Sequence, residues 1–520
     1  MNASTLRQRA EQHALRGEWP EATACFEALL ALQPGDADVL LQLSYMASLS
    51  GHYRQARHHA LAAAAAQPVD PAQVQELIAR LRTFNEVQAL HDCLARLQPL
   101  ARMPLPLLLG FGAQLSYLDE HRAALALLDE AKRRDPAAPA ILLARGQVLV
   151  FLGRFDEAEA DLLVCTRRAP GAARAWGLLV TVRRQTAASN HVDSLRRELA
   201  RPGLRPEDIA ELGFALHKSL DDLGDHEGAW TALETACRAK RSTIQYQSQD
   251  SVDLVDALRA FPASRSEGDQ EREAGPVPIF IVGMHRSGTT LLEQLLQGHR
   301  DVRGLGELYD FTTQMREATD HHCRGVIDRE IVRRAATVDF AAAGKRYLAG
   351  LAWRLGDERF FTDKLPSNFL NVGFICRALP QARILHMRRD PMETCFSNLR
   401  ELFHEANPYS YDQRELGAFY GQYSRLMAHW SAAYPGRIFE VDYAQLVADP
   451  EATLRNVAQF CGLSFEPSML NLTASERGVS TASAVAVRQG IVRPASLKWT
   501  PYARHLQPLA AALAEATRHP

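Results

Sequence analysis

The stretch PIFIVGMHRSGTTLLEQLLQGH, residues Pro278–His299, decides the fold of the second half of the chain. Its apolar run Ile279–Val282 is rich in β-branched residues, as expected of a strand covered on both faces of a parallel sheet. Gly283 ends this run, and after Gly288 leucines recur at the spacing of an amphipathic helix. The free N–H groups at the start of that helix would point into the loop, so the pattern predicts a site for an anion.

The loop has the glycine spacing of the nucleoside-triphosphate motif G-x-x-x-x-G-K-[ST], from Gly283 to Gly288. Thr289 stands where that motif has lysine, and Arg286 inside the loop is the basic residue instead. In triphosphatases the lysine bridges the terminal phosphates beside magnesium, so its loss favours an anion of different shape and chemistry without a metal. The alternative is a simple strand-to-helix turn, and Arg286 favours the anion site over it.

Length and composition set the broad class of the protein. With 520 residues the chain is too long for one core, and the length suggests about three domains. The formal net charge of −2 argues against a general nucleic-acid binder. Eight cysteines without a C-x-x-C pair predict isolated reduced thiols. We expect a cytoplasmic enzyme, because the sequence shows no secretory signal and no apolar stretch that could span a membrane. Abundant Ala and Arg with scarce Lys are typical of a GC-rich bacterial source.

Turn-forming residues recur every 34 residues in the first half of the chain, at Gly17, Gly51, Asn85, Asp119 and Gly153. A small or apolar residue follows each of them five positions later, at Ala22, Ala56, Leu90, Ala124 and Ala158. Four units close with proline, at Pro34, Pro68, Pro136 and Pro170. A unit of this length and punctuation resembles the tetratricopeptide repeat, which implies helix pairs stacked into a solenoid. Residues 172–204 and 207–240 are expected to be two degenerate or capping units.

The sequence predicts three parts. Residues 1–245 form the solenoid, residues 246–277 a connecting helix and linker, and residues 278–520 an α/β domain. The boundary rests on residues 261–277, which are polar, charged and without hydrophobic period. Alternating strands and helices in the last part indicate a parallel sheet with ligands at the carboxyl ends of its strands. The expected strands are Phe360–Thr362, Arg383–Met387 and Ile438–Val441, and the expected helices are Pro391–Phe403 and Pro450–Cys461.

Four separated motifs lie at the expected strand ends: HRSGTT at 285–290, GLGELYD at 304–310, TDKLPSN at 362–368 and RRDPMETCFS at 388–397. Together they resemble the sulfotransferases that use 3′-phosphoadenosine 5′-phosphosulfate (PAPS), in particular the bacterial tetratricopeptide-repeat sulfotransferases and the tyrosylprotein sulfotransferases. The resemblance covers residues 278 to about 505. It implies an N-terminal all-α tetratricopeptide-repeat solenoid followed by a P-loop-like parallel α/β sulfotransferase domain.

The resemblance implies two phosphate contacts. In that family the first motif wraps the 5′-phosphosulfate, which assigns this contact to Arg286, Ser287, Gly288, Thr289 and Thr290. Arg389 and Ser397 match the pair that holds the 3′-phosphate. A charged residue directly after an apolar strand also lies at the ligand face of a sheet, although an ion pair with Asp390 or a plain surface charge is the alternative for Arg389.

Further cofactor residues follow from the later motifs. Tyr443 resembles a tyrosine near the nucleotide in relatives. The segment 480–499 resembles a late family loop over the cofactor and offers Ser483 and Lys498, with Arg488 as a third candidate; an exposed loop is the alternative. Tyrosylprotein members carry another basic residue past the serine, where this chain has Glu401 with Arg400 adjacent.

Glu307 matches the glutamate that is the general base of the tyrosylprotein members. An acceptor hydroxyl is a poor nucleophile near pH 7 until a carboxylate takes its proton. Capping of a helix that starts near Tyr309 is the alternative role for Glu307. Lys364 matches a family lysine near the transferring group, and with Arg286 it would stabilise the charge of the leaving phosphate without a metal. A surface salt bridge with Asp363 is the alternative for Lys364.

The resemblance implies transfer of a sulfuryl group from PAPS as co-substrate to an acceptor hydroxyl, with no metal. A peptide tyrosine, a carbohydrate and a small alcohol or phenol all remain open as acceptors. The solenoid is expected to hold a protein or peptide partner, to be a scaffold or to support a homodimer. Two alternatives are a repeat-protein adaptor with a non-catalytic nucleotide-binding domain and a divergent phosphotransferase, which the missing loop lysine disfavours. Neither a nucleic-acid partner nor a membrane span is expected.

Overall fold

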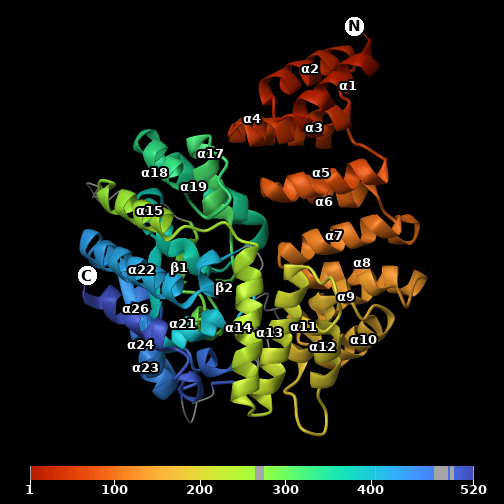
Figure 1. Cartoon of the computed structure of the whole chain (residues 1–520). Helices are drawn as coiled ribbons and strands as arrows, with labels where there is room; N and C mark the ends of the chain where they lie inside the picture. The colour runs from red at the N-terminus through yellow and green to blue at the C-terminus, as the bar shows by residue number, and fades with distance from the viewer. Residues whose placement is uncertain (1, 264–274, 404–405, 473–489, 492–496, 519–520) are drawn as a thin grey trace. The chain divides into compact units, whose positions relative to one another are not determined.

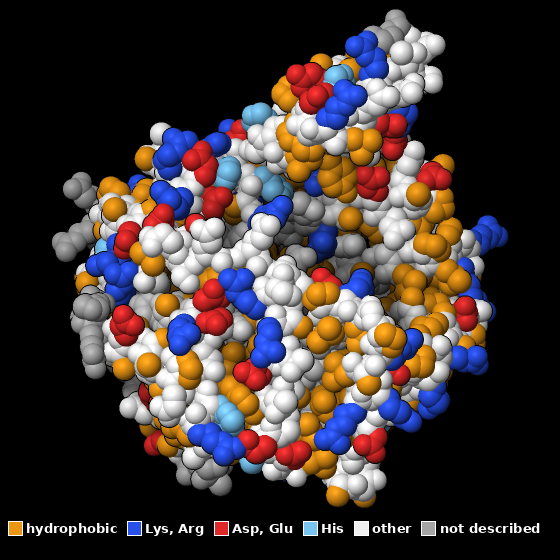
Figure 2. Space-filling model, in the orientation of Figure 1, with side chains coloured by type: hydrophobic (Ala, Val, Ile, Leu, Met, Phe, Trp, Pro, Cys, Tyr) orange, Lys and Arg blue, Asp and Glu red, His pale blue; other side chains and the backbone are white. Residues whose placement is uncertain are grey.

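The computed structural model describes residues 2–263, 275–403, 406–472, 490–491 and 497–518 (Figure 1). The chain forms two compact units, of which the first comprises Met1–Pro136 with Tyr309–Asp339 and the second Ala137–Leu308 with Phe340–Pro520. On the face shown in Figure 2, basic and acidic side chains are interspersed. Within the described residues, each helix is too short or too polar to cross a membrane.

The first unit is built from antiparallel helix pairs and two further helices from the second half of the chain. Its helices are α1 (Ala3–Leu15), α2 (Trp19–Leu32), α3 (Ala37–Leu49), α4 (Tyr53–Ala65), α5 (Pro71–Thr83), α6 (Val87–Arg96), α7 (Leu105–Tyr117), α8 (His121–Arg134), α17 (Asp310–Thr319) and α18 (Arg329–Arg334). Arg54 of α4 donates hydrogen bonds to the carbonyls of Glu317 and Ala318, at 2.8 and 2.9 Å, and so ties α17 to the repeat.

The 34-residue period marks the turn inside each helix pair. Every turn residue adopts the left-handed backbone region: φ is 73° at Gly17, 80° at Gly51, 58° at Asn85, 66° at Asp119 and 75° at Gly153. Glycine, asparagine and aspartate tolerate this region best, which explains why these residue types recur. The residues five positions later are fully buried between the paired helices. The predicted helical repeats are therefore confirmed, while their assignment as tetratricopeptide repeats stays a prediction.

Seven helices precede the sheet in the second unit. They are α9 (Pro139–Leu152), α10 (Phe155–Arg168), α11 (Ala173–Val182), α12 (Val192–Leu199), α13 (Pro206–Asp222), α14 (His226–Ser242) and α15 (Ser248–Ala260). Helices α13 and α14 approach so closely that a Cβ added at Gly213 would lie 2.8 Å from the Cβ of Ala236. The domain boundary expected within residues 246–277 stays a prediction.

The second unit contains one parallel sheet. Its strands are β1 (Val277–Gly283), β2 (Val302–Gly304), β3 (Phe360–Asp363), β4 (Arg383–Arg388) and β5 (Ile438–Asp442), in the order β2-β3-β1-β4-β5. All four neighbouring pairs are parallel, so the carboxyl ends of the strands meet at one edge. The predicted fold class, helical repeats followed by a parallel α/β domain, is confirmed.

Helices cover both faces of the central strand. Ile279 and Ile281 pack toward α16 (Thr289–Leu296), α23 (Tyr443–Ala448) and α24 (Pro450–Cys461). On the other face Phe280 stacks on Tyr347 at 5.8 Å between ring centroids. Tyr347 belongs to α19 (Phe340–Leu351). The unit also contains α20 (Val372–Ala378), α21 (Pro391–Leu399), α22 (Gln413–Ala433) and α26 (Gln507–Arg518). This double cover accounts for the continuous apolar run of β1.

The helix expected over Pro391–Phe403 is shorter than predicted, because α21 ends at Leu399. The hydroxyl of Tyr411 accepts a hydrogen bond from the Phe403 N–H at 2.8 Å and donates one to the Phe403 carbonyl at 2.6 Å. These bonds satisfy the backbone of Phe403 outside a helix, and they depend on a tyrosine that lies beyond the predicted segment.

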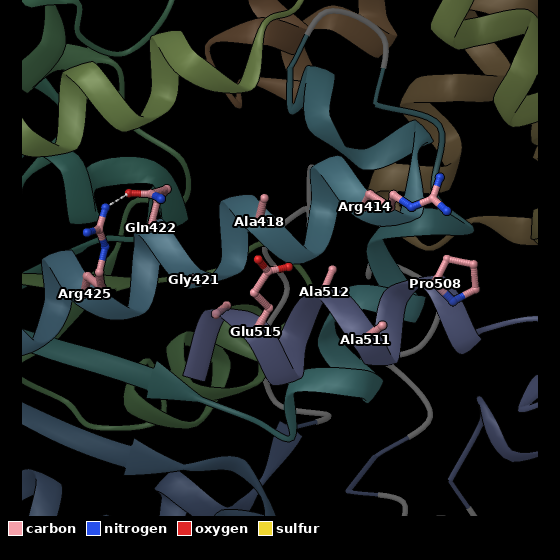
Figure 3. A pocket seen from close by; sticks show the side chains of 10 residues that line it. Arg414, Ala418, Gly421, Gln422, Arg425, Pro508, Ala511, Ala512 and Glu515 are labelled. Carbon is pink, nitrogen blue, oxygen red and sulfur yellow. Dashed lines mark hydrogen bonds between the residues drawn. The ribbon is translucent and has the colours of Figure 1, made fainter. Parts of the chain in front are cut away.

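Small residues bring α22 and α26 close together. Added Cβ atoms at Gly417 and Gly421 would lie 2.6 Å from the Cβ atoms of Ala512 and Ala516, respectively. Beside this contact is a groove of about 500 Å³, with the side chains of Arg414, Gln422, Arg425 and Glu515 around it (Figure 3). None of the residues expected at the anion site lines this groove.

All eight cysteines lie in the described residues and are free thiols, seven of them buried. Burial raises the pKa of Cys376 to about 11 and that of Cys461 to about 12. Thiols with such values stay protonated near neutral pH, so these two are inert packing residues rather than nucleophiles.

Replacement of Gly344 by alanine should destabilise the second unit. An added Cβ in α19 would lie 2.0 Å from the carbonyl oxygen of Ala378, a backbone atom that cannot move aside freely. We expect a loss of about 1–3 kcal/mol or more in the free energy of unfolding, measured by urea titration. G350A, in the same helix with no atom within 4 Å, is the matched control and should be neutral or stabilise by up to ~1 kcal/mol. Equal stability of the two variants would contradict this packing.

Candidate active site

The β1–α16 loop approaches its neighbours so closely that two of its positions require glycine. At Gly283, φ is 154° and an added Cβ would lie 2.6 Å from the Met387 carbonyl oxygen of β4. At Gly288, φ is 109° and an added Cβ would lie 2.5 Å from the ring of Tyr443. Arg286 between them is also left-handed, with φ of 67°. The loop is therefore held tightly against β4 and the start of α23.

The loop contains groups that suit an anion. Gly288 is the N-cap of α16 and supplies no side-chain cap, and the first N–H groups of that helix, including those of Thr289 and Thr290, face the loop. The Ser287 side chain is buried, and its Oγ has no hydrogen-bond partner among the described residues. A buried hydroxyl without a partner costs free energy unless a ligand or water satisfies it. Both features fit a bound phosphate-type oxygen.

Arg286 points toward the C-terminal half of α21. Its Nε donates to the Ser397 Oγ at 3.4 Å, and its Nη1 lies 3.8 Å from the Glu401 carboxylate. Burial raises the pKa of Glu401, although the guanidinium groups of Arg286 and Arg400 oppose that rise. The structure thus brings together Arg286 and Ser397, which the sequence assigned to opposite phosphates of the co-substrate.

Arg389 follows β4 and is largely buried, with 16% of its side chain exposed. It pairs with Glu393 one helical turn ahead, at 2.7 Å, and donates to the backbone carbonyl of Arg286 at 3.2 Å. Its guanidinium lies 4.6 Å from the centroid of the Tyr443 ring. The alternative pairing with Asp390 is not made, because that carboxylate caps α21 by accepting from the Glu393 N–H. Arg389 thus links the loop, α21 and Tyr443.

Glu307 and Lys364 form an ion pair at the carboxyl ends of β2 and β3. The Lys364 Nζ donates to the Glu307 Oε1 at 2.7 Å; the lysine side chain is 1% exposed and the glutamate side chain 30%. Helix α17 begins at Asp310 without a side-chain cap, so Glu307 does not cap it. Lys364 is buried beside Glu307 and is not the surface partner of Asp363. A buried ammonium needs such a partner.

Glu293 of α16 supports the candidate site through hydrogen bonds that the sequence analysis did not anticipate. Its Oε1 accepts hydrogen bonds from the Gly306 N–H and the Thr362 Oγ, both at 2.8 Å. Gly306 directly precedes Glu307, and its carbonyl accepts from the Lys364 N–H at 2.9 Å. Glu293 therefore fixes the backbone on both sides of the ion pair. The only sequence signal was a charged residue in a helix whose leucines predict burial.

His285 was also missed and lies inside the loop. Its ring packs edge-on against Phe403 at 5.6 Å, and the Asn398 side chain donates to its backbone carbonyl at 2.7 Å. Burial lowers the pKa of His285 to about 4; Glu307 opposes that shift, while Lys364 and Arg286 add to it. The imidazole is thus a neutral group close to the Glu307–Lys364 pair and Arg286.

Two late candidates lie outside the described residues, namely Ser483 and Arg488, and the third, Lys498, is described. Lys498 is an exposed residue, but its ammonium group is partly desolvated by the surrounding protein. This desolvation and the guanidinium groups of Arg400, Arg286 and Arg389 lower the pKa of Lys498. Lys498 is therefore brought to the same group of cations as the loop residues.

Within the part of the chain that the structure describes, no group of three or more His, Cys, Asp or Glu side chains is placed to hold a metal ion. The prediction that the chemistry needs no metal stays a prediction.

Several known proteins are similar to parts of this chain. Residues 278–467 match the model of the sulfotransferase family. An uncharacterized protein of Aquifex aeolicus (strain VF5) is 30% identical over 402 residues, which cover 75% of this chain and 52% of that protein. A putative protein-tyrosine sulfotransferase of Caenorhabditis briggsae is 28% identical over 197 residues, or 37% of this chain and 68% of that protein. Among solved structures, the sulfotransferase domain from the curacin biosynthetic pathway is 17% identical with a TM-score of 0.29, covering 46% of this chain and 98% of that chain.

Residues 278–467 therefore match the sulfotransferase family, and helical repeats precede them. The chain spans about half the length of the Aquifex aeolicus protein that it resembles.

The titration of His285 tests the surroundings of the loop. Because its pKa is about 4 in the folded protein, below the ordinary value near 6.5, the unfolded state binds more protons between these pH values. The free energy of unfolding should therefore fall as the pH falls through this window, and H285Q should remove that part of the dependence. Histidine NMR signals followed against pH, assigned with H285Q, measure the value directly. A midpoint near 6.5 would contradict the buried, neutral imidazole.

Proposed function

We propose that this protein is a sulfotransferase that moves a sulfuryl group from PAPS to an acceptor hydroxyl. The observation that carries the proposal is the ion pair between the buried Lys364 and the partly exposed Glu307, at strand ends adjacent to the loop of β1. This pair supplies a carboxylate that can take a proton and a fixed cation at the same edge of the sheet. The sulfotransferase family match supports the same reaction.

The residues of the loop fit the 5′-phosphosulfate of PAPS. Arg286 would bind its anionic oxygens, the unpartnered Ser287 Oγ would donate to one of them, and the N–H groups of Thr289 and Thr290 would complete the cradle beside Gly288. An anion here also meets the positive end of the dipole of α16. The loop therefore offers donors in place of the lysine of triphosphatases.

A second group of residues fits the nucleoside end of PAPS. Arg389 and Ser397 would hold the 3′-phosphate, since a guanidinium and a hydroxyl are suitable donors to it. Tyr443, already stacked on Arg389, and Lys498, close to the same cations, would border the nucleotide. The distance between the two phosphates would then select PAPS over a nucleotide that carries only one of them.

The proposed step is a direct displacement at sulfur. The acceptor oxygen forms a bond to sulfur while the bond from sulfur to the bridging oxygen of the phosphate breaks. The Glu307 carboxylate, whose Oε1 accepts from Lys364, takes the acceptor proton on its Oε2 and later releases it to water. Lys364 and Arg286 stabilise the negative charge that develops on the departing phosphate oxygen. The products are a sulfate ester and adenosine 3′,5′-bisphosphate.

The acceptor that we propose to test first is a peptide tyrosine. A tyrosine hydroxyl has an ordinary pKa near ~10, so it needs a base such as Glu307 at neutral pH. The similarity to a putative protein-tyrosine sulfotransferase and the helical repeats, which suit peptide binding, support this choice. A glycan or a small alcohol or phenol would use the same residues.

Incubation with ³⁵S-labelled PAPS tests the proposal. The full-length protein is supplied with separate pools of tyrosine peptides, glycans and small phenols or alcohols. We expect label in one pool and release of adenosine 3′,5′-bisphosphate in equal amount. Nucleotide binding with no transfer to any pool would instead favour an adaptor with a non-catalytic domain.

Glu307→Gln tests the general base. The amide keeps the shape of the side chain but cannot take a proton, so turnover should fall by roughly 10²- to 10⁴-fold. Binding of adenosine 3′,5′-bisphosphate, measured by calorimetry, should persist. E451Q, which alters an exposed glutamate of α24, is the control and should keep full turnover. Unchanged turnover of E307Q would remove Glu307 from the role of base.

Arg389→Ala tests the 3′-phosphate contact. Loss of a charge-assisted hydrogen bond should weaken binding of adenosine 3′,5′-bisphosphate by about 1.5–3 kcal/mol. The neighbouring Arg388 is 58% exposed and paired with Glu440, so R388A is the matched control and should bind like the wild type. Equal affinities of R389A and R388A would place the phosphate contact elsewhere.

A further inference from the structure

Asp221, in the last turn of α13, is partly buried and connects the helical region with the α/β domain of the second unit. Its Oδ2 accepts from the Arg400 Nη2 at 2.8 Å, and its Oδ1 accepts from the Tyr502 hydroxyl at 2.6 Å. Burial alone would raise the pKa of Asp221, but the Arg400 guanidinium and the Tyr502 hydrogen bond lower it. The carboxylate is therefore ionised near neutral pH and holds two partners at once.

His217 lies one turn earlier on the same face of α13 and is 1% exposed. Its Nδ1 donates to the Ala229 carbonyl at 2.9 Å, and burial lowers its pKa to about 4. The imidazole is thus neutral. Asp221 supplies the negative charge that this part of α13 presents to Arg400.

The first partner, Arg400, lies close to residues that contact the loop of the candidate active site. It directly follows α21 and lies three residues after Ser397, so the two occupy one face of the helix. Ser397 contacts Arg286, and Glu401, next to Arg400, lies 3.8 Å from Arg286. The charge of Arg400 also acts on Lys498. Arg400 is therefore a member of the group of cations around the proposed PAPS site.

The second partner, Tyr502, connects Asp221 with Lys498 and with the ion pair of Arg389. It is fully buried, its ring lies 5.0 Å from that of Phe396 in α21, and it follows Lys498 by four residues. Between them, the Trp499 N–H donates to the Glu393 Oε1 at 3.4 Å, and Glu393 pairs with Arg389. The hydroxyl of Tyr502 thus anchors the chain segment that carries Lys498 and touches the partner of Arg389.

We propose that Asp221 is a positioning residue for binding of the nucleoside bisphosphate part of PAPS. It fixes Arg400 and the segment 498–502, and thereby sets the cations that surround the phosphates. The inference rests on the proposed function and extends it to a residue of the helical region.

The direction of the effect separates positioning from simple electrostatics. If Arg400 stayed in place, removal of a nearby carboxylate charge would strengthen the attraction for an anion. If Asp221 positions Arg400 and Tyr502, its removal releases both and weakens the binding of the anion. A weaker affinity after a negative charge is lost is therefore specific to the positioning role.

A second ion pair between the helical region and the α/β domain provides the control. Arg241 of α14 pairs with Glu415 of α22 through two hydrogen bonds, both 2.8 Å long. This pair links the helices as Asp221 does but contacts none of the proposed phosphate-binding residues. E415Q therefore reports the cost of a loosened contact without a change at the site.

The experiment measures binding of adenosine 3′,5′-bisphosphate to the full-length protein by calorimetry, together with the melting temperature. We expect D221N and R400Q each to raise the dissociation constant about tenfold or more, which corresponds to ~1.4 kcal/mol. The effects of D221N and R400Q should not add: the double variant D221N/R400Q should weaken binding by less than the sum of the two single variants, because part of the effect of Asp221 passes through Arg400. Y502F, a milder change, should weaken binding in the same direction. E415Q should lower the melting temperature and leave the affinity unchanged.

In turnover assays with PAPS, D221N should raise the KM for PAPS and leave kcat nearly unchanged. Wild-type affinity in D221N or Y502F, tighter binding in D221N, or equal weakening in E415Q would overturn the inference and leave the proposed function standing. Failure of the wild-type protein to bind the nucleotide would instead overturn the proposed function and the inference with it.

Discussion

The close approach of the β1–α16 loop to its neighbours is the constraint on which the site depends. At Gly283 the loop meets a carbonyl of β4, and at Gly288 it meets the ring of Tyr443, with no room for a Cβ at either position. The parallel pairing of β1 with β4 sets this distance, and the same pairing places Arg389 directly beside the loop. The strand register therefore determines how far apart the proposed phosphate contacts lie.

Charge balance is the second constraint. Arg286, Arg389, Arg400 and Lys364 are all largely shielded from water, and each faces a carboxylate: Glu401, Glu393, Asp221 and Glu307, respectively. Shielded cations without partners would cost several kcal/mol each. The carboxylates thus keep the cations in place before any ligand binds, and an anionic ligand would share the cations with them. One of these carboxylates, Glu307, is also the proposed base.

The second compact unit is more than the sulfotransferase domain. Helices α9 to α14 belong to it, and α13 and α14 contact the α/β domain through Asp221, Arg241 and Cys237, whose thiol donates to the Leu399 carbonyl at 3.4 Å. Conversely, residues Tyr309–Asp339 of the α/β half pack with the first repeats. The sequence, divided where its composition changes, separates segments that the contacts join.

The sequence by itself determined features whose cause is local. The repeat was predictable because each turn needs a residue that tolerates the left-handed backbone region. The strand β1 and its loop were predictable because an apolar run followed by two spaced glycines is typical of a buried strand and a tight loop. Tertiary structure alone decided the three-residue strand β2 and the end of α21 at Leu399. It also decided the contacts that Glu293, His285 and Asp221 make. Each of these depends on contacts with residues distant in the chain, such as Tyr411 for α21 and Arg400 for Asp221. No local pattern marks such residues, because their surroundings form only when the chain has folded.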